Sequence, residues 1–271
     1  MSPPAKSCVR HGKPDLIDER AIIDPSARLA GNVSIGPFSV IGPEVEIGSG
    51  TVIGPHVVIK GPTRIGSDNR IFQFASIGDD PQDKKFAGER TELVIGDRNT
   101  IREFCTINRG TGDGGGITRV GNDNWIMAYV HIAHDCLVGN NTIFANNATL
   151  AGHVEIQDHV ILGGFAAVHQ FCRIGKHSFT AMATAINKDV PPFVMASGNL
   201  AKPHGLNTEG LKRRGFSDKA LKDIRSAYKL LYMSGLKLEE ALVKMKALGK
   251  ETQEVADMVS FIEGSSRSII R

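Results

Sequence analysis

Four histidines gather in the middle of the chain: His131, His134, His153 and His169. An unperturbed imidazole titrates near neutral pH, so it is well suited to take a proton from a hydroxyl group during catalysis. Asp135 directly follows His134, and a carboxylate beside an imidazole can orient the ring and raise its basicity. This arrangement favours general-base chemistry centred on His134.

A metal site is the competing interpretation. His131 and His134 have the H-x-x-H spacing, and histidines from neighbouring turns of a repeat protein can hold zinc. No cysteine or carboxylate pattern completes a ligand set, so we favour the base and predict no metal, with the metal alternative left open.

A six-residue repeat must position these side chains. An apolar residue recurs at every sixth position from Ile23 to Ile77, again from Ile95 to Ile107, and from Val120 to Ile186, where Thr180 is the exception. This period fits neither an α-helix nor an alternating strand, and it is typical of a parallel β-helix built from short strands and sharp corners. The first and fifth positions of each hexad should point into its interior.

Three hexads make one coil of 18 residues, and this period brings the histidines together. His134, Gly152 and Gln170 are spaced by 18 residues and should stack in one column at steps of about 4.8 Å. His153 and His169 flank that column.

Other polar or reactive residues have simpler interpretations. Three cysteines occupy the inward fifth position and should pack in the core as free thiols: Cys105, Cys136 and Cys172. Three further histidines occupy the fourth, corner position and are expected to be exposed: His56, His159 and His177.

The repeat pauses twice, over residues 79–94 and across the glycine-rich segment 110–119. Both should leave the coil as loops. The second lacks the G-x-x-x-x-G-K-[ST] pattern and a following helix, so we do not predict a phosphate cradle there.

Helical spacing replaces the repeat near residue 207. Ser217 is a good N-cap for a helix ending at Gly235, and further helices should cover 238–248 and 252–263. We therefore predict an N-terminal extension over residues 1–20, a β-helix over 21–198 and a helical domain over 199–271.

Composition excludes several classes of protein. The formal charge is +3 in 271 residues, which does not suggest nucleic-acid binding. No apolar run reaches the roughly 18 residues needed for a transmembrane segment, and the first twenty residues lack the apolar stretch of a secretory signal. The cytoplasm is the expected compartment.

Several motifs resemble the UDP-N-acetylglucosamine O-acyltransferase family, which begins lipid A biosynthesis. They are HIAHDC at 131–136, NNATLAGHV at 146–154, AVHQFC at 167–172, DVPPFV at 189–194 and GLKRRGFS at 210–217. The resemblance implies a left-handed parallel β-helix with a C-terminal α-helical domain, assembled as a homotrimer with active sites between subunits. It also implies transfer of a 3-hydroxyacyl chain from acyl carrier protein to the 3-hydroxyl of UDP-GlcNAc, without a cofactor.

The resemblance assigns roles residue by residue. His134 would be the general base, Asp135 its polarising carboxylate, and the Gly152 amide the oxyanion donor. Eleven residues would bind substrate, in three groups. Residues of the first pause would hold substrate: Gln82, Asp83 and Lys85. Residues around the base would contact sugar and phosphate: His131, His153, His169 and Gln170. Residues after the coil would contact the nucleotide: Asn207, Glu209, Arg213 and Arg214. The basic excess of the C-terminal segment would suit docking of the acidic carrier protein.

Three positions depart from the family pattern. Met182 stands where glycine leaves a long acyl channel open, so we expect a preference for about ten carbons rather than about fourteen, because each excluded methylene matters in a shaped pocket. Leu200 replaces a nearby residue that is often histidine, and we assign it to acyl-chain specificity together with Met182. Asn108 also replaces a histidine.

Four alternatives remain open. The acceptor could be the 3-amino analogue of UDP-GlcNAc, which would give an amide. A zinc-dependent hexapeptide hydratase of the carbonic anhydrase type would need stoichiometric metal. The related N-acyltransferase would need an N-terminal uridine-binding domain, and a non-catalytic scaffold would leave the histidine cluster unexplained.

Overall fold

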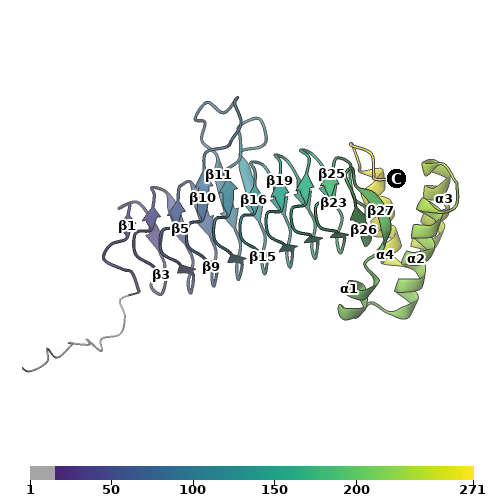
Figure 1. Cartoon of the computed structure of the whole chain (residues 1–271), viewed down its shortest axis with the longest axis horizontal. Helices are drawn as coiled ribbons and strands as arrows, with labels where there is room; N and C mark the ends of the chain where they lie inside the picture. The colour runs from purple at the N-terminus through teal and green to yellow at the C-terminus, as the bar shows by residue number, and fades with distance from the viewer. Residues whose placement is uncertain (1–15) are drawn as a thin grey trace, which may run out of the picture.

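The computed structural model describes residues 16–271, so most of the predicted extension over residues 1–20 lies outside the described part. The coil contains twenty-five short strands, from β1 (Ile22–Ile23) to β25 (Ala185–Ile186), and all but β10 and β13 end at the first position of a hexad. They wind into a left-handed parallel β-helix capped by helices at its C-terminal end (Figure 1). The predicted fold class is therefore confirmed.

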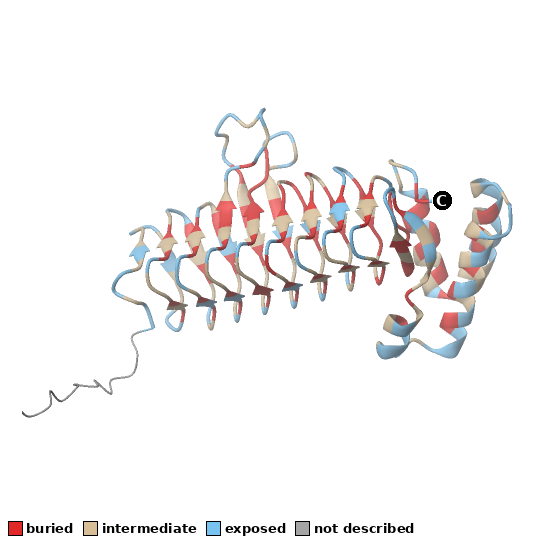
Figure 2. Ribbon diagram, in the orientation of Figure 1, coloured by how far each residue is buried: buried red, intermediate tan, exposed pale blue. Residues whose placement is uncertain are grey.

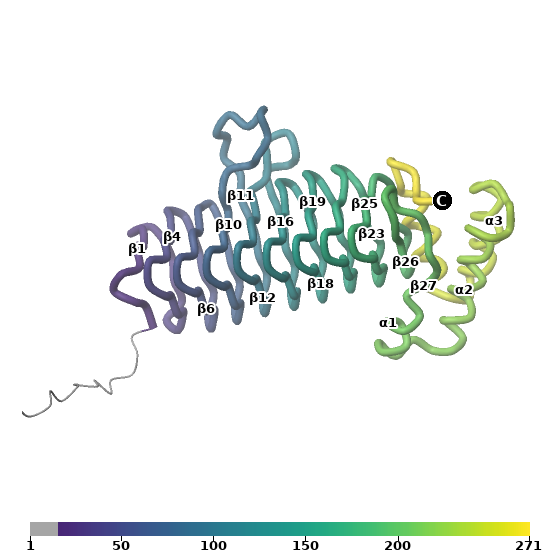
Figure 3. Tube along the Cα trace, viewed as in Figure 1, coloured from purple at the N-terminus to yellow at the C-terminus, as the bar shows by residue number. Residues whose placement is uncertain are grey.

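The coil has three flat sheets, which the chain visits in turn (Figure 3). The first sheet holds β1, β4 (Val40–Ile41), β7 (Val58–Ile59), β10 (Ser76–Asp79), β13 (Thr106–Asn108), β16 (His131–Ile132), β19 (Thr149–Leu150), β22 (Ala167–Val168) and β25. The second holds β2 (Arg28–Leu29), β5 (Val45–Ile47), β8 (Thr63–Ile65), β11 (Glu92–Ile95), β14 (Ile117–Val120), β17 (Leu137–Val138), β20 (Glu155–Ile156) and β23 (Arg173–Ile174). The third holds β3 (Ser34–Ile35), β6 (Val52–Ile53), β9 (Arg70–Ile71), β12 (Thr100–Ile101), β15 (Trp125–Ile126), β18 (Ile143–Phe144), β21 (Ile161–Leu162), β24 (Phe179–Thr180), β26 (Val194–Ser197) and β27 (Lys202–Leu206).

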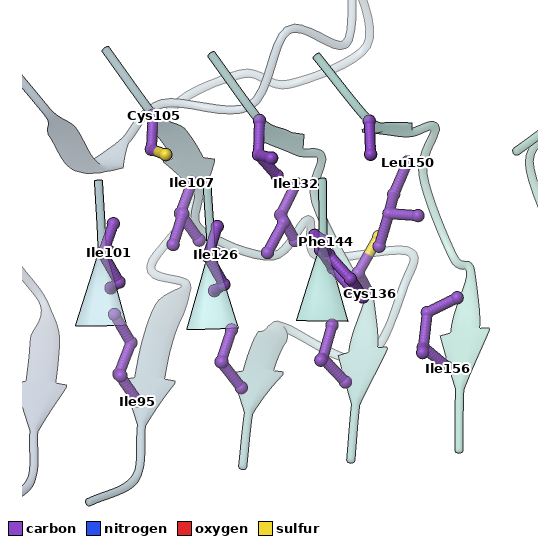
Figure 4. Packing of buried hydrophobic residues seen from close by; sticks show 14 of the residues in the cluster. Ile95, Ile101, Cys105, Ile107, Ile126, Ile132, Cys136, Phe144, Leu150 and Ile156 are labelled. Atoms are coloured by element: carbon purple, nitrogen blue, oxygen red, sulfur yellow. The ribbon is translucent and has the colours of Figure 1, made fainter. Parts of the chain in front are cut away.

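The interior is a narrow stack of branched aliphatic side chains. Every first position from Ile35 to Ile186 is buried, and these side chains repeat from coil to coil (Figures 2 and 4). Cys105, Cys136 and Cys172 are fully buried free thiols, as predicted. Burial raises the pKa of the Cys105 and Cys136 thiols to about 12, so neither is a reactive nucleophile.

The corners have a regular backbone. The fourth position of nearly every hexad adopts a positive φ, even where the residue is not glycine. For example, φ is 59° at Asp135 and 62° at His153. This left-handed conformation is uncommon for side chains other than glycine, and here it turns the chain from one sheet to the next.

Two loops leave the coil between strands of the first and second sheets. The first loop (residues 80–91) lies between β10 and β11, and the second loop (residues 109–116) lies between β13 and β14. They project side by side from one edge of the coil (Figure 1). A hydrogen bond of 3.0 Å from the Gly112 amide to the Glu89 carboxylate joins them.

Four helices follow the coil: α1 (Thr208–Arg213), α2 (Asp218–Tyr232), α3 (Leu238–Gly249) and α4 (Gln253–Glu263). Ser217 caps α2 as predicted, accepting from the Ala220 amide at 3.1 Å. The predicted C-terminus of α2 at Gly235 lies three residues too late, and α1 and the antiparallel strand β27 were not predicted. Among residues 16–271, no helix is long and apolar enough to cross a membrane.

Candidate active site

The predicted column of His134, Gly152 and Gln170 forms at one edge of the coil. Ile132, Leu150 and Val168 pair in register, and the column residues follow them by two positions at the corner between the first and second sheets. The His153 amide donates to the His134 carbonyl at 3.0 Å, and the Phe171 amide to the Gly152 carbonyl at 3.1 Å. We call the corner segments 133–136, 151–154 and 169–172 the histidine edge.

His134 and Asp135 form a hydrogen-bonded pair on this edge. His134 Nδ1 lies 2.8 Å from Asp135 Oδ2, and the carboxylate side chain is only 1% exposed. Since the carboxylate accepts from Nδ1–H, the other ring nitrogen, Nε2, is left without a proton and can accept one from a substrate. This is the geometry of an oriented general base.

The second loop encloses Asp135, which the sequence did not reveal. The Thr111 amide donates to Oδ1 at 2.9 Å and the Thr111 hydroxyl to Oδ2 at 2.7 Å, while the Asp135 amide donates to the Thr118 hydroxyl at 2.8 Å. Gly114 approaches so closely that a Cβ there would lie 2.1 Å from the carboxyl carbon. The glycine-rich segment thus covers a carboxylate instead of cradling a phosphate.

Gly152 lies directly against the imidazole of His134. A Cβ at position 152 would lie 2.4 Å from Cε1 and 2.7 Å from Nε2. The Gly152 amide donates to no acceptor within residues 16–271, so it is available to a ligand next to the base.

His131 and His153 complete the surroundings of His134. The His153 ring meets the His134 ring edge-on, with centroids 5.1 Å apart, and its Nε2 lies 3.7 Å from Asp135 Oδ2. His131 Nδ1 lies 2.7 Å from the Thr106 hydroxyl. Burial, reinforced by the neighbouring His134, lowers the pKa of His131, and burial likewise lowers the pKa of His153. Both rings are therefore neutral at physiological pH.

Two of the three predicted residues of the first loop line a cavity beside this edge. Asp83 and Lys85 line a space of about 280 Å³ between the two loops, together with Thr111. Asp83 is close enough to His153 to influence its titration. Gln82 is exposed on the same loop.

His169 and Gln170 lie exposed at the other end of the histidine edge. The resemblance implies contacts with sugar and phosphate for both, and their exposure leaves them free to bind a ligand.

The predicted nucleotide-binding residues lie at a different corner of the coil. Asn207 caps α1 by accepting from the Gly210 amide at 3.2 Å, and its side-chain amide donates to the His177 carbonyl at 3.0 Å. His177 follows β23, so this corner joins the second and third sheets. Within one chain, the residues of this group are not brought to His134: Asn207, Glu209, Arg213 and Arg214.

The prediction of an exposed corner is wrong for His177. Its ring stacks on His159 at 4.6 Å and is packed between Phe193 and Phe216, because the C-terminal domain covers this end of the coil. Burial, followed by the influence of His159, lowers the pKa of His177 to about 4.

The two proposed chain-length residues are both exposed. Met182 is 74% exposed at the corner between the third and first sheets, and Leu200 is 56% exposed. Asn199, beside Leu200, pairs with Ala185 of β25, so both residues lie at the C-terminal end of the first sheet. Asn108 is buried, and its amide donates to the Asp80 carbonyl at 2.9 Å, at the base of the first loop.

A metal would have one candidate site on this edge. One ligand atom each from His134, Asp135 and His153 lie within 4.8 Å of one another. The Asp135 oxygens already accept hydrogen bonds from Thr111 and His134, so ligation would require those bonds to break.

Comparisons with known proteins find relatives that match nearly the whole chain. Residues 189–270 match the family model described as UDP N-acetylglucosamine O-acyltransferase, domain 2, and residues 26–61 and 117–152 match the bacterial transferase hexapeptide model. The chain is 62% identical over 260 residues to an acyl-[acyl-carrier-protein]–UDP-N-acetylglucosamine O-acyltransferase of Herminiimonas arsenicoxydans, covering 94% of this chain and 99% of the relative. It is 59% identical over 256 residues to the enzyme of the same name from Stenotrophomonas maltophilia strain K279a, covering 94% and 97%.

Solved structures share the fold over nearly the whole chain. The UDP-N-acetylglucosamine acyltransferase of Francisella novicida superposes with a TM-score of 0.93 at 48% identity, covering 94% of each chain. The UDP-N-acetylglucosamine O-acyltransferase of Moraxella catarrhalis gives 0.93 at 48% identity, covering 95% of this chain and all of the other.

Proposed function

Because the chain belongs to the UDP-N-acetylglucosamine O-acyltransferase family, we propose that it transfers a 3-hydroxyacyl chain from acyl carrier protein to the 3-hydroxyl of UDP-GlcNAc, the first step of lipid A biosynthesis. The observation that carries this proposal is the His134–Asp135 pair, 2.8 Å apart and with the carboxylate buried, next to the free amide of Gly152.

The chemistry follows from these atoms. His134 Nε2 takes the proton of the sugar hydroxyl as its oxygen attacks the thioester carbonyl carbon. The Gly152 amide donates to the oxyanion of the tetrahedral intermediate. The C–S bond then breaks, and the imidazolium returns the proton to the departing pantetheine thiolate, while Asp135 stabilises the charge on the ring throughout.

No cofactor is needed in this proposal because the thioester is already activated. The test is direct: prolonged dialysis against a chelator should leave the rate of transfer unchanged. A loss of activity that zinc restores would instead support the metal site of His134, Asp135 and His153.

The role of His134 is tested by His134→Ala. We expect kcat to fall by about 10²- to 10⁴-fold, the usual contribution of a positioned base, with KM and oligomeric state preserved. Assays with UDP-GlcNAc and its 3-amino analogue in parallel identify the acceptor. A variant that keeps full activity would remove His134 from the base role.

We propose that Met182 limits the acyl chain to about ten carbons. Between the histidine edge and Met182, the outward side chains of the first sheet are small: Thr149, Ala167 and Ala185. An acyl chain bound at His134 can lie along this surface and end at the Met182 side chain.

A homotrimer is part of the proposal because one chain leaves the site incomplete. Arg214 and Asn207 lie at the corner beside His177, whereas His134 lies at another corner. A second copy must therefore bring the nucleotide-binding group to the base.

The outer faces of the coil indicate where copies meet. The outward row of the second sheet is mostly charged: Arg28, Glu46, Arg64, Val94, Arg119, Leu137, Glu155 and Arg173. The outward row of the first sheet carries no lysine, arginine, aspartate or glutamate: Ile22, Val40, Val58, Ser76, Thr106, His131, Thr149, Ala167 and Ala185. Such a face suits burial against another protein.

A stack of aromatic rings along one border of the first sheet also favours this face as the contact between copies. Five rings at the corner between the third and first sheets stack from coil to coil with centroids 4.8–5.2 Å apart: Phe38, His56, Phe74, Phe104 and Tyr129. The three phenylalanines and the tyrosine among them are each about half exposed. An exposed apolar stripe of this length is unusual on a monomer.

Mixed oligomers test the shared site. His134→Ala and Arg214→Ala subunits, each impaired alone, should regain measurable transfer when co-expressed, because some interfaces then combine an intact His134 with an intact Arg214. Sedimentation should give three chains per particle. A monomer with full activity would refute the shared site.

We also propose the cytoplasm as the compartment. Cys105, Cys136 and Cys172 are unpaired thiols, which is usual where the redox environment is reducing.

A further inference from the structure

The C-terminal segment after α4 (residues 264–271) pairs with the coil at Asp189, directly beyond the histidine edge. In the repeat pattern the Asp189 amide would donate to the Gln170 carbonyl, as the Phe171 amide does to the Gly152 carbonyl one coil earlier. It donates instead to the Ser268 carbonyl at 2.9 Å, and the Ile270 amide donates to the Asp189 carbonyl at 2.9 Å. The terminal segment, yellow in Figure 3, thus lies against the last coils.

This insertion brings Arg267 to the end of the histidine edge. Its Nη2 lies 3.4 Å from His169 Nδ1, which is also 3.1 Å from the Gln170 carbonyl. Nδ1 can serve only one of these partners at a time. When Arg267 donates to Nδ1, the ring proton is on Nε2, and that N–H is free to donate to a ligand.

Lys188 adds a second cation at the same place. It follows Gln170 by 18 residues, so it occupies the same corner position one coil further along, and it is exposed. Within residues 16–271, neither Lys188 nor Arg267 forms an ion pair with a carboxylate. The adjacent Asp189 is fully buried, and its oxygens accept from the Arg173 amide at 2.8 Å and the Ser265 hydroxyl at 2.7 Å.

We propose that Arg267, Lys188 and His169 form a binding site for a phosphate ester carried by a substrate. This proposal rests on the proposed function, and the two cations lie outside the residues that the family resemblance implicates. A guanidinium offers paired donors to phosphate oxygens, and an ammonium adds a point charge. The site lies two to three coils from His134 along one edge, about 10–15 Å, so one extended substrate can span both.

Two substrate groups have this chemistry. UDP-GlcNAc carries a diphosphate, and the phosphopantetheine arm of the acyl donor carries a phosphodiester. The site acts on binding and not on the reacting atoms, so its loss should change KM and leave kcat nearly unchanged.

Steady-state kinetics with each substrate varied separately tests the site. We expect Arg267→Ala and Lys188→Ala to raise the KM of one substrate by about 10-fold, as for the loss of a charge-assisted hydrogen bond, with kcat within about threefold. Arg267→Lys, which keeps the charge, should recover part of the affinity. Arg28→Ala, at an exposed arginine of β2 near the N-terminal end of the coil, is the matched control and should behave as the parent.

Calorimetry on the full-length trimer identifies the source of the phosphate. If the nucleotide diphosphate binds here, Arg267→Ala weakens binding of UDP alone. If the phosphodiester of the donor arm binds here, the parent binds 4′-phosphopantetheine more tightly than pantetheine, and Arg267→Ala abolishes this preference.

Two results would overturn the proposal. One is unchanged KM for both substrates in both alanine variants. The other is a lower Tm and kcat in Arg267→Ala with KM unchanged and Lys188→Ala silent, which would assign Arg267 to anchoring the C-terminal segment. A parent enzyme that fails to acylate UDP-GlcNAc in the same assay would refute the proposed function itself.

Discussion

Replacing Gly152 with alanine tests the contact between the backbone of one coil and the imidazole of the next. The added Cβ would lie 2.4 Å from His134 Cε1, whereas ordinary contacts of this kind begin near 3.4 Å. The ring must therefore move by about 1 Å, and a displacement of this size in a catalytic group can cost about 10²-fold in rate. The substitution keeps the amide that would donate to the oxyanion, so the loss reports on the base alone.

The assay is acyl transfer from 3-hydroxydecanoyl carrier protein to UDP-GlcNAc with the purified protein. We expect kcat of Gly152→Ala to fall about 100-fold with Tm close to that of the parent. Gly31→Ala is the matched control, since Gly31 occupies the same hexad position and a Cβ there meets no atom within 4 Å. Full activity in Gly152→Ala would show that the position of the His134 ring does not limit the reaction.

Three further predictions concern the carboxylate, the acyl channel and a buried histidine. Asp135→Asn should lower kcat by about 10²- to 10⁴-fold at unchanged KM, because an amide has one acceptor oxygen and cannot serve the Thr111 amide at the Oδ1 position as well as His134 and the Thr111 hydroxyl at the Oδ2 position; a rate within twofold of the parent would exclude the carboxylate from orienting the base. Met182→Gly should raise the ratio of kcat/KM for fourteen- over ten-carbon donors by at least about 10-fold, and a parent that already prefers fourteen carbons would contradict the channel. The pKa of His177 is about 4 in the folded protein and near 6.5 when unfolded, so the unfolded chain binds the extra proton and stability is lost as pH falls from about 6.5 toward 4. Between pH 7 and pH 5 this costs about 2 kcal/mol, and urea denaturation should show that much less pH dependence in His177→Gln; an equal dependence in parent and variant would refute the burial argument.

The hexad period was enough to predict the coil and the column on its edge. Because each coil stacks directly on the one before, residues 18 apart must align, and His134, Gly152 and Gln170 do so. The inward cysteines follow from the same rule. A period carries no information about segments that interrupt it, so the loop that brings Thr111 and Gly114 onto Asp135 could not be placed from sequence.

Contacts between distant segments of the chain determine the features that the repeat does not predict. The burial of His177 depends on α1 and the residues around Phe216 folding back over a corner that the repeat alone leaves open. The approach of Arg267 to His169 depends on the C-terminal segment replacing one hydrogen bond of the coil. Local sequence therefore determined which residues share an edge, since the repeat sets their register. The tertiary structure determined which edge each distant segment covers, because that depends on contacts between parts of the chain that have no common period.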